Sequence, residues 1–193
     1  METLRYHHPL RVLLLVALCL IPTMGQAQEH RSDALDDVLE YIPYASVFAL
    51  KACGVSSRDD WPKLALTTAA SWVVTAGAGY VLKHSIHEWR PDHSDRKSFP
   101  SGHALIAFAG ATALHYEFHH VSPWISVSAY TLATAVAVDR VVRDRHHWYN
   151  VAAGAGIGVC ATAVTWWVSD RIIKNDRVQL GFTGNRVDLA IRL

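Results

Sequence analysis

Apolar residues gather in five segments along the chain, with short polar stretches between them. The segments cover about residues 42–52, 64–82, 104–114, 123–138 and 151–169. Alanine, valine, leucine and tryptophan dominate them, and they lack the alternation of apolar and polar positions that is typical of half-buried strands. Their lengths favour helices. The pattern therefore predicts an all-α fold, a bundle of about five to six helices.

Two of these segments are long enough to cross a bilayer. Residues 64–82 and residues 151–169 each run for 19 positions without a charge. Both are rich in small residues, and the three glycines at alternate positions from Gly154 to Gly158 would let a neighbouring helix approach closely. The first and third segments are short for spanning. We expect a membrane-embedded bundle, with a soluble helical bundle as the alternative.

The two ends of the chain differ from this core. Residues 1–27 resemble a secretory signal peptide, with an apolar stretch at 12–21 and a small-x-small cleavage site at 25–27; the alternative is an uncleaved anchor helix. Residues 28–175 then form the helical-bundle domain. In the tail, residues 176–193, apolar and polar positions alternate on both sides of a turn signal, which predicts a short β-hairpin-like appendage.

The composition of the chain excludes several classes of protein. The chain has 18 Lys and Arg against 17 Asp and Glu, so no overall positive field would draw in nucleic acid. A hydrophobic fraction of 51% excludes a disordered protein. Three cysteines are too few for a disulfide framework or a zinc site, and we expect Cys53 and Cys160 to be buried free thiols. Twelve histidines point to proton transfer, nucleophilic attack or metal binding.

Polar residues collect at three helix ends. Lys83 and Arg90 follow the 64–82 segment and, seven residues apart, would face one side of a continued helix. Ser101 is a natural N-cap, after which the backbone N–H groups of Gly102 and His103 offer an anion site. The third cluster, residues 139–150, carries further arginines and histidines before the last apolar segment.

Antiparallel packing of the last four helices in turn would place all three clusters at one end of the bundle. Seven of the 18 basic residues would meet there and form a cationic site: Lys83, Arg90, Arg96, Lys97, Arg140, Arg143 and Arg145. The alternative is that these are ordinary polar loops and positive residues flanking membrane helices.

These clusters resemble the motifs of the type 2 phosphatidic acid phosphatase superfamily, which also includes bacterial acid phosphatases and vanadium haloperoxidases. The K-x6-RP motif is complete from Lys83 to Pro91, and the PSGH motif is complete at Pro100–His103. The third motif, SR-x5-H-x3-D, has Asp139 in place of serine and Asn150 in place of aspartate. The resemblance covers about residues 60–170.

The resemblance implies a phosphatase that works through a phosphohistidine intermediate. His146 would be the nucleophile, and His103 the general acid that afterwards activates water. The groups that hold the phosphoryl oxygens would be Lys83, Arg90, Arg140, Ser101 and the backbone N–H of Gly102. No cofactor and no metal would be required.

Asn150 touches this chemistry, because the family's aspartate accepts a hydrogen bond from the nucleophilic imidazole and fixes its tautomer. The corresponding change in a serine protease triad costs roughly 10⁴ in rate. We expect an active phosphatase that Asn150 slows, with an inactive, lipid-phosphate-binding homologue as the alternative.

A cationic site at a bilayer surface suits a phosphorylated membrane lipid. By resemblance the candidates are lipid A, undecaprenyl diphosphate, phosphatidylglycerol phosphate and phosphatidic acid. The exported N-terminus predicts a protein of the bacterial inner membrane whose active site faces the periplasm. The alternatives are a soluble periplasmic acid phosphatase and, least favoured, a vanadium haloperoxidase.

Overall fold

The computed structural model describes residues 37–173, together with the backbone of residues 178–183 and 186–191. The signal-peptide prediction for residues 1–27 lies outside the described residues.

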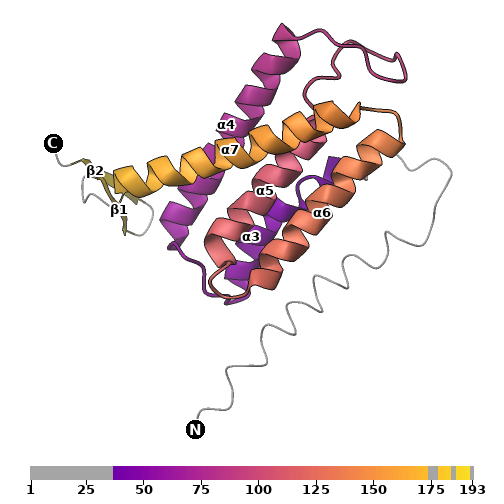
Figure 1. Ribbon diagram of the computed structural model, residues 1–193. Helices are drawn as coiled ribbons and strands as arrows, with labels where there is room; N and C mark the ends of the chain where they lie inside the picture. The colour runs from indigo at the N-terminus through magenta and orange to yellow at the C-terminus, as the bar shows by residue number, and fades with distance from the viewer. Residues whose placement is uncertain (1–36, 174–177, 184–185, 192–193) are drawn as a thin grey trace.

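Five helices make up the bundle in the described part of the chain: α3 (Ile42–Ala52), α4 (Trp61–Ser85), α5 (Gly102–Phe118), α6 (Pro123–Val142) and α7 (Trp148–Ile173). Helix α5 is central, contacting α3, α4, α6 and α7, and α7 crosses both α4 and α5 (Figure 1). Most of the residues of α5 are buried. The predicted helical bundle is confirmed.

The four longer helices extend beyond the apolar segments that predict them. Capping sets two of the starts: Asp60 accepts from the Lys63 N–H at 3.3 Å, and Ser122 accepts from the Trp124 N–H at 3.3 Å. A proline follows each cap within the first turn, where its missing N–H costs nothing. At the other ends, basic residues such as Lys83 and Arg140 continue the last turn, where the helix dipole favours cations.

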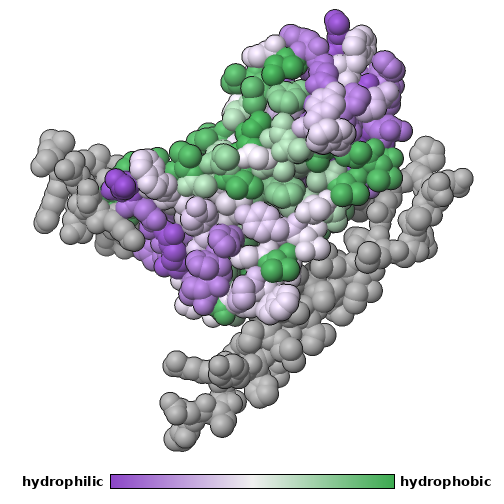
Figure 2. All heavy atoms as spheres, in the orientation of Figure 1, coloured by the Kyte–Doolittle hydropathy of each residue, from purple (hydrophilic) through white to green (hydrophobic). Residues whose placement is uncertain are grey.

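Among the residues that the structure describes, three helices are long and apolar enough to cross a membrane: α4, α6 and α7. The sequence predicts only the first and last of these, because the charge at Asp139 ends the apolar segment that becomes α6. Large apolar side chains such as Val73, Val138 and Trp167 are exposed on these helices. Figure 2 shows a hydrophobic band between two hydrophilic ends. These are the features of a membrane protein.

Helices α5 and α7 pack closely because of two glycines. A Cβ atom at Gly154 would overlap the carbonyl oxygen of Ser101, and one at Gly158 would overlap that of Leu105. Gly156, between them, faces open space. The close approach that the glycines predict is therefore made by two of the three, and it sets the start of α7 directly against the start of α5.

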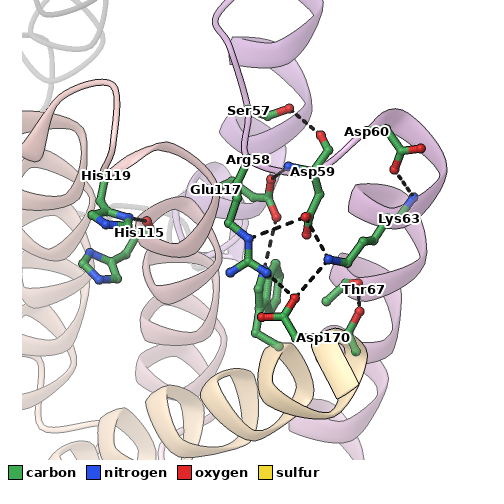
Figure 3. Close-up of polar contacts among 12 residues, drawn as sticks. Ser57, Arg58, Asp59, Asp60, Lys63, Thr67, His115, Glu117, His119 and Asp170 are labelled. Atoms are coloured by element: carbon green, nitrogen blue, oxygen red, sulfur yellow. Dashed lines mark hydrogen bonds and ion pairs between the residues drawn. The ribbon is translucent and has the colours of Figure 1, made fainter. Parts of the chain in front are cut away.

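An ion cluster joins the helices at the end of the bundle where α5 and α7 finish (Figure 3). We call it the distal cluster. Glu117, fully buried in α5, accepts from the Asp59 backbone N–H and from Trp166 Nε1, each at 3.1 Å. Lys63 Nζ lies 2.9 Å from carboxylate oxygens of both Asp59 and Asp170. The cluster consists of Arg58, Asp59, Lys63, Glu117 and Asp170.

Cys53 and Cys160 are free, as predicted, but both are exposed rather than buried. The prediction of burial is wrong for Cys160 because α7, a helix of a membrane bundle, can present apolar residues outward as well as to the core, and for Cys53 because it is the C-cap residue beyond the end of α3. An apolar neighbourhood in the sequence therefore does not identify the core side.

The backbone of the tail pairs as two antiparallel strands, β1 (Val178–Thr183) and β2 (Arg186–Ile191). Val178 lies opposite Ile191, and Thr183 lies opposite Arg186.

Candidate functional site

The three polar clusters of the sequence meet at the end of the bundle opposite the distal cluster. The Ser101 N–H donates to the Asn150 carbonyl at 3.0 Å, which joins the second cluster to the third. Arg90 donates from a guanidinium nitrogen to the Arg145 carbonyl at 3.4 Å, which joins the first cluster to the third. We call this region the site end. It is hydrophilic where α4 ends and the loop to α5 begins, at the upper right of Figure 2.

Three cations of the site end act on one another. Lys83 lies in the last turn of α4, Arg140 is buried in the last turn of α6, and Arg90 comes from the loop between α4 and α5. The positive charges of Arg90 and Arg140 both act on Lys83, whose ammonium donates to the Lys97 carbonyl at 3.1 Å. Cations held this close repel one another and attract an anion.

Lys83 and Arg90 do not share a helix. Helix α4 ends at Ser85, and the chain at Ile86 is extended, so the argument from helical rotation is wrong. The loop folds back on itself instead: Arg90 Nε pairs with Asp95 at 2.9 Å, and its backbone N–H donates to the Asp95 carbonyl. This turn carries the guanidinium of Arg90 to the third cluster.

The start of α5 holds an unsatisfied hydroxyl. Ser101 is the N-cap residue, as predicted, but its side chain caps no backbone N–H. Its Oγ is buried and has no hydrogen-bond partner in the part of the chain that the structure describes. Gly102 follows, and a Cβ there would lie 3.8 Å from Lys83 Cε, so the helix start and the lysine are adjacent. A buried donor beside a cation suits an anionic ligand.

His146 is buried, and one of its two ring nitrogens makes a hydrogen bond to the backbone. Its Nδ1 lies 2.8 Å from the Ser98 carbonyl oxygen, and because a carbonyl only accepts, Nδ1 carries the hydrogen. Burial lowers the pKa of His146 to about 3, and the charges of Arg90, Lys83 and Arg140 add to that shift. The imidazole is therefore neutral near pH 7, with an unprotonated Nε2 that can act as a nucleophile.

Asn150 does not receive the hydrogen bond that the sequence assigns to it. Its Nδ2 donates to Ser98 Oγ at 2.7 Å, and its Oδ1 is buried without a partner among the described residues. The hydrogen bond that fixes the His146 tautomer goes instead to the backbone carbonyl of Ser98. Ser98 thus holds both residues, the histidine through its carbonyl and the asparagine through its hydroxyl.

His103, in the first turn of α5, faces two carboxylates that sequence reasoning missed. Its Nε2 lies 2.9 Å from Asp37 Oδ1, and its Nδ1 lies 3.7 Å from Glu40 Oε2. Burial lowers the pKa of His103, and so does the charge of Arg140, while Asp37 raises it. Neither acidic residue belongs to a motif, and their only sequence signal is a place in the polar stretch before α3.

Four other histidines of the described residues make contacts of their own. His84 Nδ1 bonds to the Tyr80 carbonyl at 2.8 Å on an exposed face of α4, and His147 stacks on Tyr149. His115 and His119 stack on each other near the end of α5, toward the distal cluster. Within the described residues, no group of three or more His, Cys, Asp or Glu side chains could hold a metal ion.

A family model and several relatives match this chain. The family model described as the PAP2 superfamily matches residues 63–174, a range that contains all three motifs. A lipid A 1-phosphatase of Porphyromonas gingivalis is 32% identical over 142 residues, which are 73% of this chain and 32% of that protein. A bacitracin transport permease protein, BcrC, of Bacillus licheniformis is 31% identical over 81 residues, 42% of this chain and 38% of that protein.

The fold also has a solved counterpart. The crystal structure of Aquifex aeolicus LpxE superposes with a TM-score of 0.54 at 17% identity, covering 82% of this chain and 94% of that one. The chain spans about a third of the length of the curated relatives that it matches.

Proposed function

This chain belongs to the PAP2 superfamily, and from that premise we propose that it is a phosphatase that removes phosphate from a membrane lipid through a phosphohistidine intermediate. The observation that carries the proposal is the state of His146. A buried, neutral imidazole donates from Nδ1 to a carbonyl and keeps Nε2 unprotonated, and three cations act on it.

In the first step Nε2 of His146 attacks phosphorus in line with the leaving oxygen. The N–P bond forms as the P–O bond breaks, and His103 gives its proton to the departing oxygen. Lys83, Arg90 and Arg140 stabilise the charge that spreads over the phosphoryl oxygens. The Ser101 hydroxyl and the Gly102 N–H donate to the same oxygens. The Ser98 carbonyl stabilises the positive charge that develops on the imidazole ring.

In the second step water replaces the histidine on phosphorus. His103, now neutral, takes a proton from the water as its oxygen attacks, and the N–P bond breaks. Inorganic phosphate leaves, His146 is neutral again, and His103 is protonated for the next cycle. Every group needed for both steps comes from this chain.

We propose lipid A, or a lipid phosphate of similar form, as the substrate. The relative from Porphyromonas gingivalis is a lipid A 1-phosphatase, and the LpxE structure supports the same fold. Helices α4, α6 and α7 would keep the protein in the bilayer, so that the phosphorylated head group reaches the site end while the acyl chains stay in lipid. We place the protein in the bacterial inner membrane, with this end facing the periplasm.

The test is phosphate release by the purified, detergent-solubilised protein. The panel holds lipid A, undecaprenyl diphosphate, phosphatidylglycerol phosphate and phosphatidic acid. We expect His146→Ala to lower kcat by at least about 10³-fold and to leave no acid-labile phosphohistidine after a single turnover. His147→Ala is the matched control, because His147 is the adjacent histidine and stacks on Tyr149. Full activity in His146→Ala would contradict the mechanism.

Membrane placement is tested separately by cell fractionation. The three candidate spans favour a membrane enzyme over a soluble periplasmic acid phosphatase. Release of the protein by osmotic shock without detergent would favour the soluble enzyme instead.

A further inference from the structure

The ring of His103 lies between two carboxylates that come from the same short segment. Residues 37–39 are helical, residues 40–41 form a turn, and α3 follows. This geometry sets Asp37 against Nε2 at 2.9 Å and Glu40 against Nδ1 at 3.7 Å. An ionised carboxylate only accepts, so Nε2 can donate to Asp37, whereas Glu40 lies at ion-pair distance from Nδ1.

The two carboxylates differ in burial. The side chain of Asp37 is 63% exposed, whereas that of Glu40 is 10% exposed. The exposed group is easily displaced by water or by a ligand, and the buried group is not. A leaving oxygen that approaches from outside the protein therefore reaches Nε2 by replacing Asp37, while Nδ1 stays turned toward Glu40.

We propose that Glu40 is the positioning residue of the general acid: it holds the Nδ1 side of His103, so that Nε2 faces the leaving oxygen, and Asp37 occupies the place that this oxygen takes. The inference rests on the proposed phosphatase function and adds to it a residue outside the three motifs.

The charges around Glu40 fit this role. Burial raises the pKa of Glu40 to about 7, with a further rise from Asp37, while a hydrogen bond to Tyr41 and the charges of Arg140 and Lys83 lower it. Burial and the charges of Arg140 and Lys83 lower the pKa of His103, and Asp37 opposes them. An ionised Glu40 favours the protonated ring.

The proton balance of the first step follows from this pairing. The proton on Nε2 of His103 moves to the leaving oxygen while the P–O bond breaks and the bond to His146 Nε2 forms. Nδ1 keeps its hydrogen, directed at Glu40, throughout. In the second step Nε2 recovers a proton from the attacking water, so Glu40 neither gains nor loses a proton in the cycle.

The experiment removes the negative charge of one carboxylate at a time, first on one side of the His103 ring and then on the other. Glu40→Gln and Asp37→Asn are assayed from pH 5 to 9 for release of phosphate from a lipid phosphate. We expect Glu40→Gln to lower kcat by about 10²-fold, the scale of a lost partner behind a catalytic group. Asp37→Asn should lower kcat less than tenfold, because the leaving oxygen displaces this residue and only the effect of its charge on His103 is lost.

The pH dependence of the rate distinguishes a positioning role of Glu40 from a purely structural role, because the loss of a purely structural contact would not shift the pKa of His103. The rate falls at high pH as His103 loses its proton. Without the charge beside Nδ1 the pKa of His103 is lower, so in Glu40→Gln this fall should begin about one pH unit earlier. Glu40→Asp, which keeps the charge on a shorter side chain, should recover part of both effects and carries the same test should Glu40→Gln not fold.

The leaving group supplies a second readout. An aryl phosphate with an acidic phenol leaves without help from an acid, so kcat/KM for that substrate should change less than tenfold in Glu40→Gln. Equal effects of Glu40→Gln and Asp37→Asn, or an unchanged pH profile in Glu40→Gln, would overturn the inference. A wild-type protein that releases no phosphate from any lipid or aryl phosphate would overturn the proposed function instead.

Discussion

The two polar ends of the bundle differ in how their charged side chains are paired. In the distal cluster the cations Arg58 and Lys63 pair with carboxylates on neighbouring elements, and the buried Glu117 accepts two hydrogen bonds. At the site end Arg90 pairs with Asp95, but the positive charges of Arg90 and Arg140 also act on Lys83. There, Ser101 Oγ and Asn150 Oδ1 are buried without partners among the described residues.

Within one fold, the distal cluster stabilises the packing of the helices, whereas the site end serves the proposed function. Paired charges of the distal cluster connect the start of α4 to the ends of α5 and α7 and so fix the packing of the bundle. The same three helices carry their other ends to the site. The like charges that act on Lys83 there cost stability, and a bound phosphate would offset their repulsion.

Lys83→Met gives the largest expected effect of the changes that test this contrast. It removes a cation beside the helix start, so we expect kcat/KM to fall by about 10²- to 10³-fold. The melting temperature should stay the same or rise, because repulsion with Arg90 and Arg140 is relieved. Phosphate release and a tryptophan-fluorescence melt measure the two quantities.

The control for this change is Lys97→Met, which removes an exposed cation from the loop between α4 and α5. Its rate should fall less than tenfold. A large loss of melting temperature in Lys83→Met would contradict the contrast between the two ends.

Lys63→Met should have the reverse profile. It removes one of the two cations that Asp59 and Asp170 share, the other being Arg58, and breaking such a largely buried pair costs about 3 kcal/mol. The melting temperature should therefore fall by roughly 6–12 °C. The kcat of the protein that remains folded, measured well below the melt, should be unchanged.

Arg171→Met is the matched change at the same end, since Arg171 is exposed and lies over the Trp167 ring at 4.9 Å. It should lower the free energy of unfolding by less than about 1 kcal/mol. An equal loss in both variants would mean that burial of the ion pairs does not matter.

The helices could be predicted from the sequence better than their ends. Apolar segments locate all five, and the bounds of α3 match the prediction, because burial and lipid contact both require apolar residues. The helix ends are set by caps and by polar last turns, which hydropathy does not register. Glu117 shows this most clearly: it lies beyond the apolar segment at 104–114, yet it is fully buried within α5.

The candidate site could be predicted only as far as its motifs. The motifs contain the histidines and cations of the site, because the proposed phosphate transfer depends on these side chains. They do not name Ser98, whose contribution is a backbone carbonyl that any residue type would supply. Nor do they name Glu40, which reaches His103 from 63 positions away in the chain through tertiary packing alone.

Asn150→Asp gives the smallest expected effect and tests whether the site end needs another charge. Because His146 Nδ1 already donates to the Ser98 carbonyl, the tautomer does not depend on residue 150. We expect kcat to stay within about tenfold of the wild type. Asn150→Asp also removes the amide donor from a buried site, so the free energy of unfolding should fall by about 1–3 kcal/mol.

Ser98→Ala is the control, because it removes the hydroxyl and keeps the carbonyl, and its kcat should change equally little. A rise approaching the roughly 10⁴-fold that a corrected tautomer gives would show instead that the missing carboxylate limits this enzyme.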